Sequence, residues 1–201
     1  NNMDKKIMSL GALLLCALGA GAKVTLPPMF TSNMVIQQKT SAPVWGKATP
    51  TTTVNVTPSW NNKTMVTCAD DNVMVGEVWL CTGQSNMEMP LDGWGKIDNF
   101  EQEIANANHP RIRLLNIKKS ISPRPLDNVE AEGGGWQVCS PQTIPEFSAC
   151  AYFFGRDLEK YRGVAIGLIE DCWGGSYAEN WTSGEALSDL PYFCNQVKEV
   201  A

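Results

Sequence analysis

The hydrophobic pattern changes near residue 75, and the change divides the chain into two regions. From residue 23 to 74, short β-prone runs alternate with Gly, Pro and Asn, which is typical of a β domain. This region is roughly fifty residues long, and because a self-sufficient sandwich usually needs about 100, we expect only a partial β-sandwich. Its expected strands are Met34–Ile36, Pro43–Trp45, Thr51–Val56 and Met65–Thr67.

From residue 75 to 201, longer apolar runs alternate with segments of helical periodicity. Residues 78–81 and 164–169 are almost wholly apolar, which is typical of strands buried on both faces, and 112–117 predicts a third strand. Helices are expected near 100–107, 147–161 and 178–187, and the polar stretch 120–135 predicts a loop or lid. In the second helix the predicted buried face consists of Phe147, Ala151, Phe154, Leu158 and Tyr161.

This order of strands and helices indicates an α/β fold. Short links between β, α and β elements predict a parallel sheet in a three-layer α/β/α arrangement. In such sheets, reacting groups gather at the carboxyl ends of the strands. Two polar loops, 83–87 and 173–176, follow predicted strands, so both should lie at that edge.

The first 22 residues have the pattern of an export signal. Lys5 and Lys6 precede an apolar run from Ile7 to Leu18, and Ala20-Gly21-Ala22 supplies small residues for cleavage. The run is too short for a membrane span. We therefore expect a signal peptide at 1–22 and an exported protein, periplasmic, extracellular or at the cell surface. Cys16 leaves a lipid-anchored variant open.

Composition excludes several classes of function. The net charge of -5 and the pI near 4.9 provide no basic surface for nucleic acid or anionic membranes. A single histidine, His109, and the lack of any Cys-x-x-Cys pair argue against a zinc site, so no metal is predicted. Export would permit disulfides, although an unpaired buried thiol is the ordinary state for cysteines in apolar runs. The six cysteines after the signal are Cys68, Cys81, Cys139, Cys150, Cys172 and Cys194.

Ser85 is the candidate nucleophile. It lies in Gly83-Gln84-Ser85-Asn86-Met87, directly after a predicted buried strand. A serine at a strand-to-helix turn can present its hydroxyl to a substrate while backbone N–H groups face the developing oxyanion. Serine and asparagine are also common turn and N-cap residues, and Met87 replaces the second glycine of a G-x-S-x-G elbow, so the spacing alone leaves a structural role open.

Three ordered blocks make the sequence resemble a known family. Residues 76–90, 147–156 and 167–181 closely resemble blocks of the sialate O-acetylesterases, which belong to the SGNH-hydrolase superfamily. Residues 26–46 also resemble the start of that family's accessory β domain. The likeness covers nearly all of the chain after residue 22 and implies an SGNH-hydrolase-like fold, here incomplete.

The resemblance implies roles for individual residues. Ser85 would attack the acetyl ester of a sugar, and its own N–H would be one oxyanion donor. Gly174 or Gly175 would supply a second donor, an alternative that the sequence leaves open. Gln84, Asn86 and Glu179 would support the substrate pocket. The implied substrate is O-acetylated sialic acid, and the implied reaction requires no metal and no organic cofactor.

The departures from the family pattern concern the catalytic base. The family's later blocks, which carry an oxyanion asparagine and an Asp-x-x-His base, have no counterpart up to Ala201. His109 falls in a stretch that is non-catalytic in the family. Several strands expected before Gly76 are also missing after Asp71. We therefore expect a shortened or truncated chain that is nearly inactive alone, because a serine without a base is a weak nucleophile.

Two other functions remain open. The same nucleophile and oxyanion donors would serve an esterase acting on another acetylated glycan, such as xylan. A non-catalytic carbohydrate-binding protein could keep the fold without the base. In that protein Trp45, Trp60, Trp94 and Trp136 would stack on sugars, although core packing is the more frequent role of an isolated tryptophan.

Overall fold

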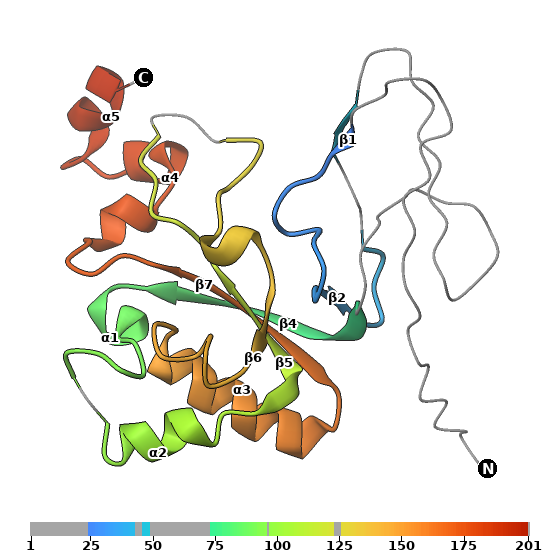
Figure 1. Cartoon of the computed structure of the whole chain (residues 1–201). Coiled ribbons are helices and arrows are strands. Elements are labelled where there is room, and N and C mark those ends of the chain that lie inside the picture. The colour runs from blue at the N-terminus through green and yellow to red at the C-terminus, as the bar shows by residue number, and fades with distance from the viewer. Residues whose placement is uncertain (1–23, 43–45, 49–72, 96, 123–125, 201) are drawn as a thin grey trace, which may run out of the picture.

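A mixed five-stranded sheet forms the centre of the protein (Figure 1). The computed structural model describes residues 24–42, 46–48, 73–95, 97–122 and 126–200. The first four strands of the sheet run parallel, whereas the last is antiparallel to its neighbour, so the prediction of a purely parallel sheet is wrong at this edge. In spatial order the strands are β2 (Val35–Gln37), β4 (Met74–Gly83), β7 (Ala165–Cys172), β5 (His109–Asn116) and β6 (Gln137–Cys139).

The segment predicted as an accessory β domain contributes a strand to this sheet. β2 pairs in parallel with the start of β4, with Val35 opposite Met74 and Gln37 opposite Gly76. β1 (Val24–Thr25) and β3 (Lys47–Ala48) form a separate antiparallel pair. The other expected strands of this segment, at 43–45, 51–56 and 65–67, lie outside the described residues. The partial β-sandwich and its boundary therefore stay predictions.

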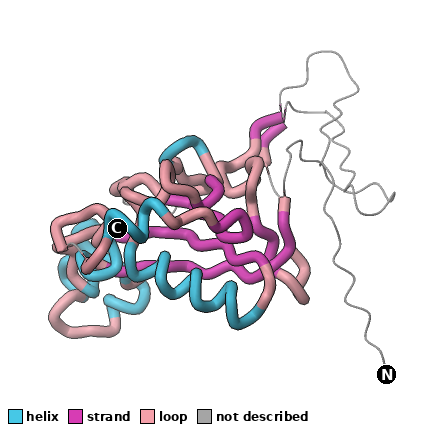
Figure 2. The backbone as a smooth tube through the Cα atoms, turned by 60° about the horizontal axis from the view of Figure 1, so that its bottom comes forward, coloured by secondary structure: helices cyan, strands magenta, loops and turns pink. Residues whose placement is uncertain are grey.

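Helices cover one face of the sheet. Figures 1 and 2 show α3 (Ala149–Arg162) packed along this face, with α2 (Phe100–Ala105) beside it. Alternate strand residues such as Ile112, Ile166 and Leu168 point into the core beneath the helices, where they are fully buried. The polar backbone ends of α3 are satisfied locally: Ser148 caps its start by accepting from Ala151 N at 3.0 Å, and Gly163 ends it with a left-handed φ of 64°.

The predicted buried face of this helix is confirmed at Phe147, Ala151 and Leu158, which are buried or pack against the core, and is wrong at Phe154 and Tyr161. Its buried residues are Ala149, Ala151, Tyr152 and Gly155, whereas Phe154 and Tyr161 are 43% and 84% exposed. The small residues explain the rotation, because they let the helix approach the sheet closely: a Cβ on Gly155 would lie 2.6 Å from Leu168 Cδ1. Phe154 instead packs edge-on against Trp79, with ring centroids 5.1 Å apart.

The opposite face of the sheet is covered by irregular chain. Segments around residues 26–34 and 131–136, including the 3₁₀ turn η1 (Glu132–Gly134), pack against Leu115. Trp136 is buried here and donates from its indole nitrogen to Met29 O at 3.0 Å. Trp136 is therefore a core residue and does not present a sugar-stacking surface.

The C-terminal part lies beyond the end of β7. The helix predicted at 178–187 is interrupted: η2 (Ala178–Trp181) is followed by α4 (Gly184–Ser188), with Ser183 as the N-cap of α4. α5 (Cys194–Val200) follows. Within the described ranges, no helix combines the length and the apolar character that crossing a membrane requires.

Candidate active site

Ser85 lies in a tight turn at the carboxyl end of β4. The strand ends at Gly83, whose φ of 151° is one that residues with a Cβ rarely adopt. Gln84 caps the short helix α1 (Ser85–Glu88), and its carbonyl oxygen accepts from Met87 N and Glu88 N at 2.9 Å each. Ser85 is half-buried and its hydroxyl donates to Gln84 Oε1 at 3.2 Å. The hydroxyl is therefore held at the surface of the turn, as a nucleophile requires.

The loop after β7 meets this turn. Trp173 N donates to Gly83 O at 3.0 Å, and Ser176 N closes a turn onto Trp173 O at 3.2 Å. Gly175 has a φ of 77°, which accounts for a glycine at this position. A Cβ on Gly174 would lie 3.7 Å from Ser85 Cα. The structure thus brings together the two loops that the sequence places at the carboxyl ends of neighbouring strands.

The two glycines of this loop differ in their hydrogen bonds. Gly174 N donates to Glu88 Oε2, and the other oxygen of the same carboxylate accepts from Lys119 Nζ. No partner for Gly175 N is seen among the described residues. Of the two predicted donors, only Gly175 N is therefore uncommitted in this conformation.

Of the residues predicted to support the pocket, Gln84 and Asn86 flank Ser85 in the chain and Glu179 lies on η2. Asn86 is exposed on α1, next to Ser85, and Glu179 is half-buried in η2. η2 is tied to the glycine loop because Trp181 Nε1 donates to Ser176 Oγ at 2.8 Å, and that hydroxyl donates to Trp173 O at 2.6 Å. Trp181, two positions after Glu179, therefore ties η2 to the loop that faces Ser85.

His109 lies at the far end of the sheet. It is the first residue of β5, and three positions later Ile112 pairs with Ile166 near the start of β7. Gly83, two positions before Ser85, pairs instead with Cys172 at the end of β7. About nine residues of strand, roughly 30 Å at about 3.3 Å per residue, separate the two ends. His109 Nε2 instead lies 3.2 Å from the Tyr152 hydroxyl, and burial lowers its pKa. His109 is therefore not a base for Ser85.

Comparison with known proteins agrees with this geometry. Residues 75–199 match the family described as carbohydrate esterase, sialic acid-specific acetylesterase, which is more than half of the chain. The chain belongs to this family of carbohydrate esterases. Ser85, Glu88, Gly174 and Gly175 all fall within the matched segment.

Individual relatives support the same assignment. The sialate O-acetylesterases of Pongo abelii and Homo sapiens are each 33% identical to the chain over 122 residues, 58% of this chain and 23% of theirs. A crystal structure of a carbohydrate acetylesterase from Xanthomonas citri superimposes with a TM-score of 0.75 at 29% identity, covering 84% of this chain and 44% of that one. The chain thus spans about a quarter of the length of these curated relatives.

A buried carboxyl lies close to the Ser85 site and was not singled out by the sequence. Glu170 of β7 is 4% exposed and accepts from Ser148 N at 2.9 Å. Burial raises its pKa to about 7, and the nearby Glu88 charge acts in the same direction, while the Ser148 hydrogen bond and Lys119 oppose the change. Two acidic residues, Glu170 and Asp171, in an otherwise apolar strand were the available signal, together with Glu88, which lies one helical turn after Ser85.

The buried cysteines of the sheet are poor nucleophiles. The cysteines in the described part of the chain form no disulfide bonds, and Cys68 lies outside that part. Burial raises the pKa of Cys81 to about 11 and those of Cys139 and Cys172 to about 12, so these thiols stay protonated at neutral pH. In the described part of the chain, no group of three His, Cys, Asp or Glu side chains is arranged to hold a metal ion.

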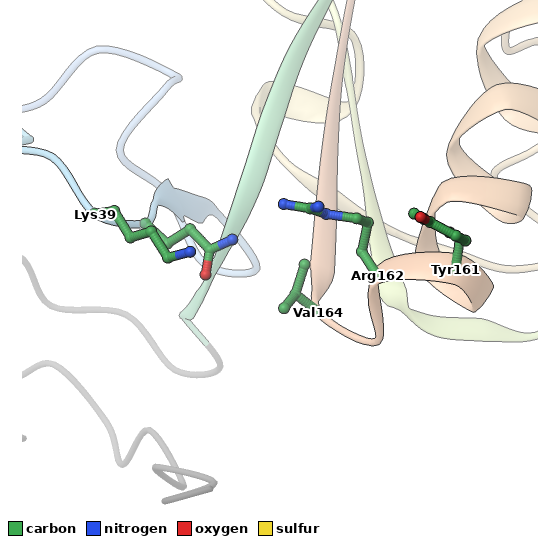
Figure 3. A pocket seen from close by; sticks show the side chains of 5 residues that line it. Lys39, Tyr161, Arg162 and Val164 are labelled. Atoms are coloured by element: carbon green, nitrogen blue, oxygen red, sulfur yellow. The ribbon is translucent and has the colours of Figure 1, made fainter. Parts of the chain in front are cut away.

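An open cavity of about 470 Å³ lies at the opposite end of the sheet from Ser85 (Figure 3). It is lined by Lys39, which follows β2, and by Tyr161, Arg162 and Val164 between α3 and β7. Arg162 is already paired, since Nε and Nη2 donate to Glu77 Oε1 at 2.9 and 2.7 Å and hold the pKa of Glu77 below its usual value. Ser85 is not among the residues that line this cavity, so the cavity is separate from the Ser85 site.

Proposed function

We propose that this chain carries the nucleophile of a carbohydrate O-acetylesterase. The proposal rests on one observation: within the segment that matches the esterase family, Ser85 is held at a strand-to-helix turn directly against the Gly174-Gly175 loop. A half-buried hydroxyl beside uncommitted backbone N–H groups is the arrangement that acyl transfer needs.

In this reaction Ser85 Oγ attacks the acetyl carbonyl carbon and gives its proton to a general base. The Ser85 N–H and the Gly175 N–H hold the oxyanion, and each such donor contributes about 3 kcal/mol to lowering the barrier in comparable sites. The bond to the sugar oxygen then breaks, the sugar hydroxyl leaves with the proton, and water releases acetate from Ser85. Since His109 is out of reach of Ser85, a group other than His109 accepts this proton.

The substrate we propose is an O-acetylated sialic acid. The curated relatives are named for this activity, whereas the solved neighbour is named only as a carbohydrate acetylesterase. An esterase for another acetylated glycan, such as xylan, is therefore the second candidate. Trp94 is 66% exposed between α1 and α2, so it is available for contact with a sugar of either kind. Export through the N-terminal signal fits both glycans.

Acetate release tests the proposal. Residues 23–201 and the corresponding Ser85→Ala variant are incubated with 9-O-acetylated sialic acid, acetylated xylan and a chromogenic acetate ester, and acetate is measured enzymatically. We expect release by the unsubstituted chain to be slow, since its one histidine, His109, is out of reach of Ser85, and to disappear in Ser85→Ala. Release that persists in Ser85→Ala would contradict the assignment of the nucleophile. Sugar binding that is unaffected by Ser85→Ala, without acetate release, would favour a carbohydrate-binding protein.

A further inference from the structure

Three segments far apart in the sequence meet at one carboxylate beside Ser85. Glu88 lies on α1, Lys119 follows β5, and Gly174 follows β7. Glu88 uses one oxygen for Gly174 N and the other for Lys119 Nζ. Its side chain is only 17% exposed, whereas that of Lys119 is 46% exposed. The carboxylate therefore joins the helix that carries the nucleophile to the glycine loop, and a cation at the surface holds it there.

The charges explain why both partners are needed. A carboxylate next to an oxyanion site opposes the negative charge that develops during acyl transfer, unless a cation neutralises it. Lys119 supplies that cation, and its ammonium also lies 5.9 Å from the centroid of the Trp173 ring in the same loop. A hydrogen bond from a backbone N–H to an ionised carboxylate is stronger than one to a neutral oxygen. The Lys119–Glu88 pair thus gives a firm hold on Gly174 without leaving net charge at the site.

We propose that Glu88 and Lys119 are positioning residues for the oxyanion loop. Glu88 holds Gly174 at a set distance from Ser85, which leaves the Gly175 N–H to the substrate, and Lys119 keeps Glu88 oriented and neutralised. The role in catalysis rests on the proposed esterase function. The hold on Gly174 does not, and it can be measured without activity.

The first test is amide exchange and NMR of the chain labelled with ¹⁵N-glycine. In Glu88→Ala we expect the Gly174 amide proton to move upfield and to exchange at least tenfold faster, because its acceptor is gone. Gly163, whose N–H donates to Glu159 O at the end of α3, is the internal control and should not change. Unchanged exchange at Gly174 would overturn the proposal whether or not the protein is active.

The second test is kinetic and uses the esterase assay. Lys119→Met leaves Glu88 unneutralised, so we expect kcat to fall about tenfold with little change in KM. Lys119→Arg should restore most of the rate. Removing the charge as well, in Lys119→Met/Glu88→Gln, should recover part of the loss, because glutamine keeps an acceptor for Gly174 N. Lys118→Met is the matched control: Lys118 pairs with the exposed Glu130 at 3.7 Å, and kcat should be unchanged.

The two tests separate the possible failures. A normal rate in Lys119→Met, in a protein that does release acetate, would refute the positioning role while leaving the esterase function intact. A Gly174 amide that responds to Glu88→Ala in a protein without esterase activity would support the hold on Gly174 and count against the proposed function and the catalytic role.

Discussion

Glu170 should make the folded protein less stable as the pH rises through the neutral range. Its carboxyl is buried in β7, where desolvation raises its pKa from the ordinary 4.5 to about 7. Because the folded state holds this proton more tightly than the unfolded chain, the contribution to stability is complete below about pH 4.5 and is lost as the pH rises to about 7. At about 1.4 kcal/mol for each pH unit between the two values, the loss is about 3 kcal/mol.

Glu170→Gln isolates this effect. Glutamine has nearly the same shape, keeps an oxygen that can accept from Ser148 N, and does not titrate. We therefore expect the free energy of unfolding of the variant, minus that of the unsubstituted chain, to increase by about 3 kcal/mol from pH 4 to pH 8. The nearby Glu88 and Lys119 charges are present in both proteins, so they largely cancel in the difference.

Urea unfolding followed by circular dichroism, at half-unit steps from pH 4 to pH 8, measures this difference. Glu146→Gln removes an exposed carboxyl close to Ser148 and controls for the loss of one negative charge. A difference between Glu170→Gln and the unsubstituted chain that stays flat across this range would refute the reasoning. So would a difference that decreases with pH, since that sign belongs to a carboxyl whose pKa is lowered by folding.

Two further predictions concern the packing of α3. Gly155→Ala should lower the free energy of unfolding by about 1–2 kcal/mol, although alanine favours helices, because its Cβ would lie 2.6 Å from Leu168 Cδ1. Gly184→Ala should be neutral or stabilising, because the nearest atom to the added Cβ is 3.6 Å away. Equal effects of Gly155→Ala and Gly184→Ala on urea unfolding would contradict the packing argument. Ser148→Ala should lower the free energy of unfolding by about 1–2 kcal/mol, because it removes the buried N-cap of α3. A comparable loss in Ser183→Ala, which removes the exposed N-cap of α4, would show that burial of the cap does not matter.

The candidate site itself was largely predictable, because its parts follow from local sequence and from one rule of topology. Apolar runs ending in Gly83 and near Trp173 predicted two strands, and parallel strands bring their carboxyl ends to one edge. Ser85 and the Gly174-Gly175 loop were therefore expected to meet, and they do. The family to which the chain belongs was readable from the same blocks.

Tertiary structure alone decided the features that depend on partners far away in the chain. Periodicity pointed to Phe154 and Tyr161 as the buried face of α3, but the small residues at Ala151 and Gly155 allow the closest approach to the sheet, and this sets the rotation of the helix. β2 joined the central sheet because strand pairing is a long-range contact that hydrophobic pattern does not specify.

The same distinction separates the residues of the site. The prediction that the strand before Ser85 is buried on both faces is wrong, because Trp79 and Leu80 of β4 are 41% and 63% exposed. The sequence by itself determined that Ser85 follows a strand at a turn, because turn chemistry and apolar runs are local properties. It did not determine the links of Glu88 to Lys119 and Gly174, or the burial of Glu170 beneath Ser148. Charge pairing and desolvation are set by which segments the fold brings together, so only the tertiary structure could decide them.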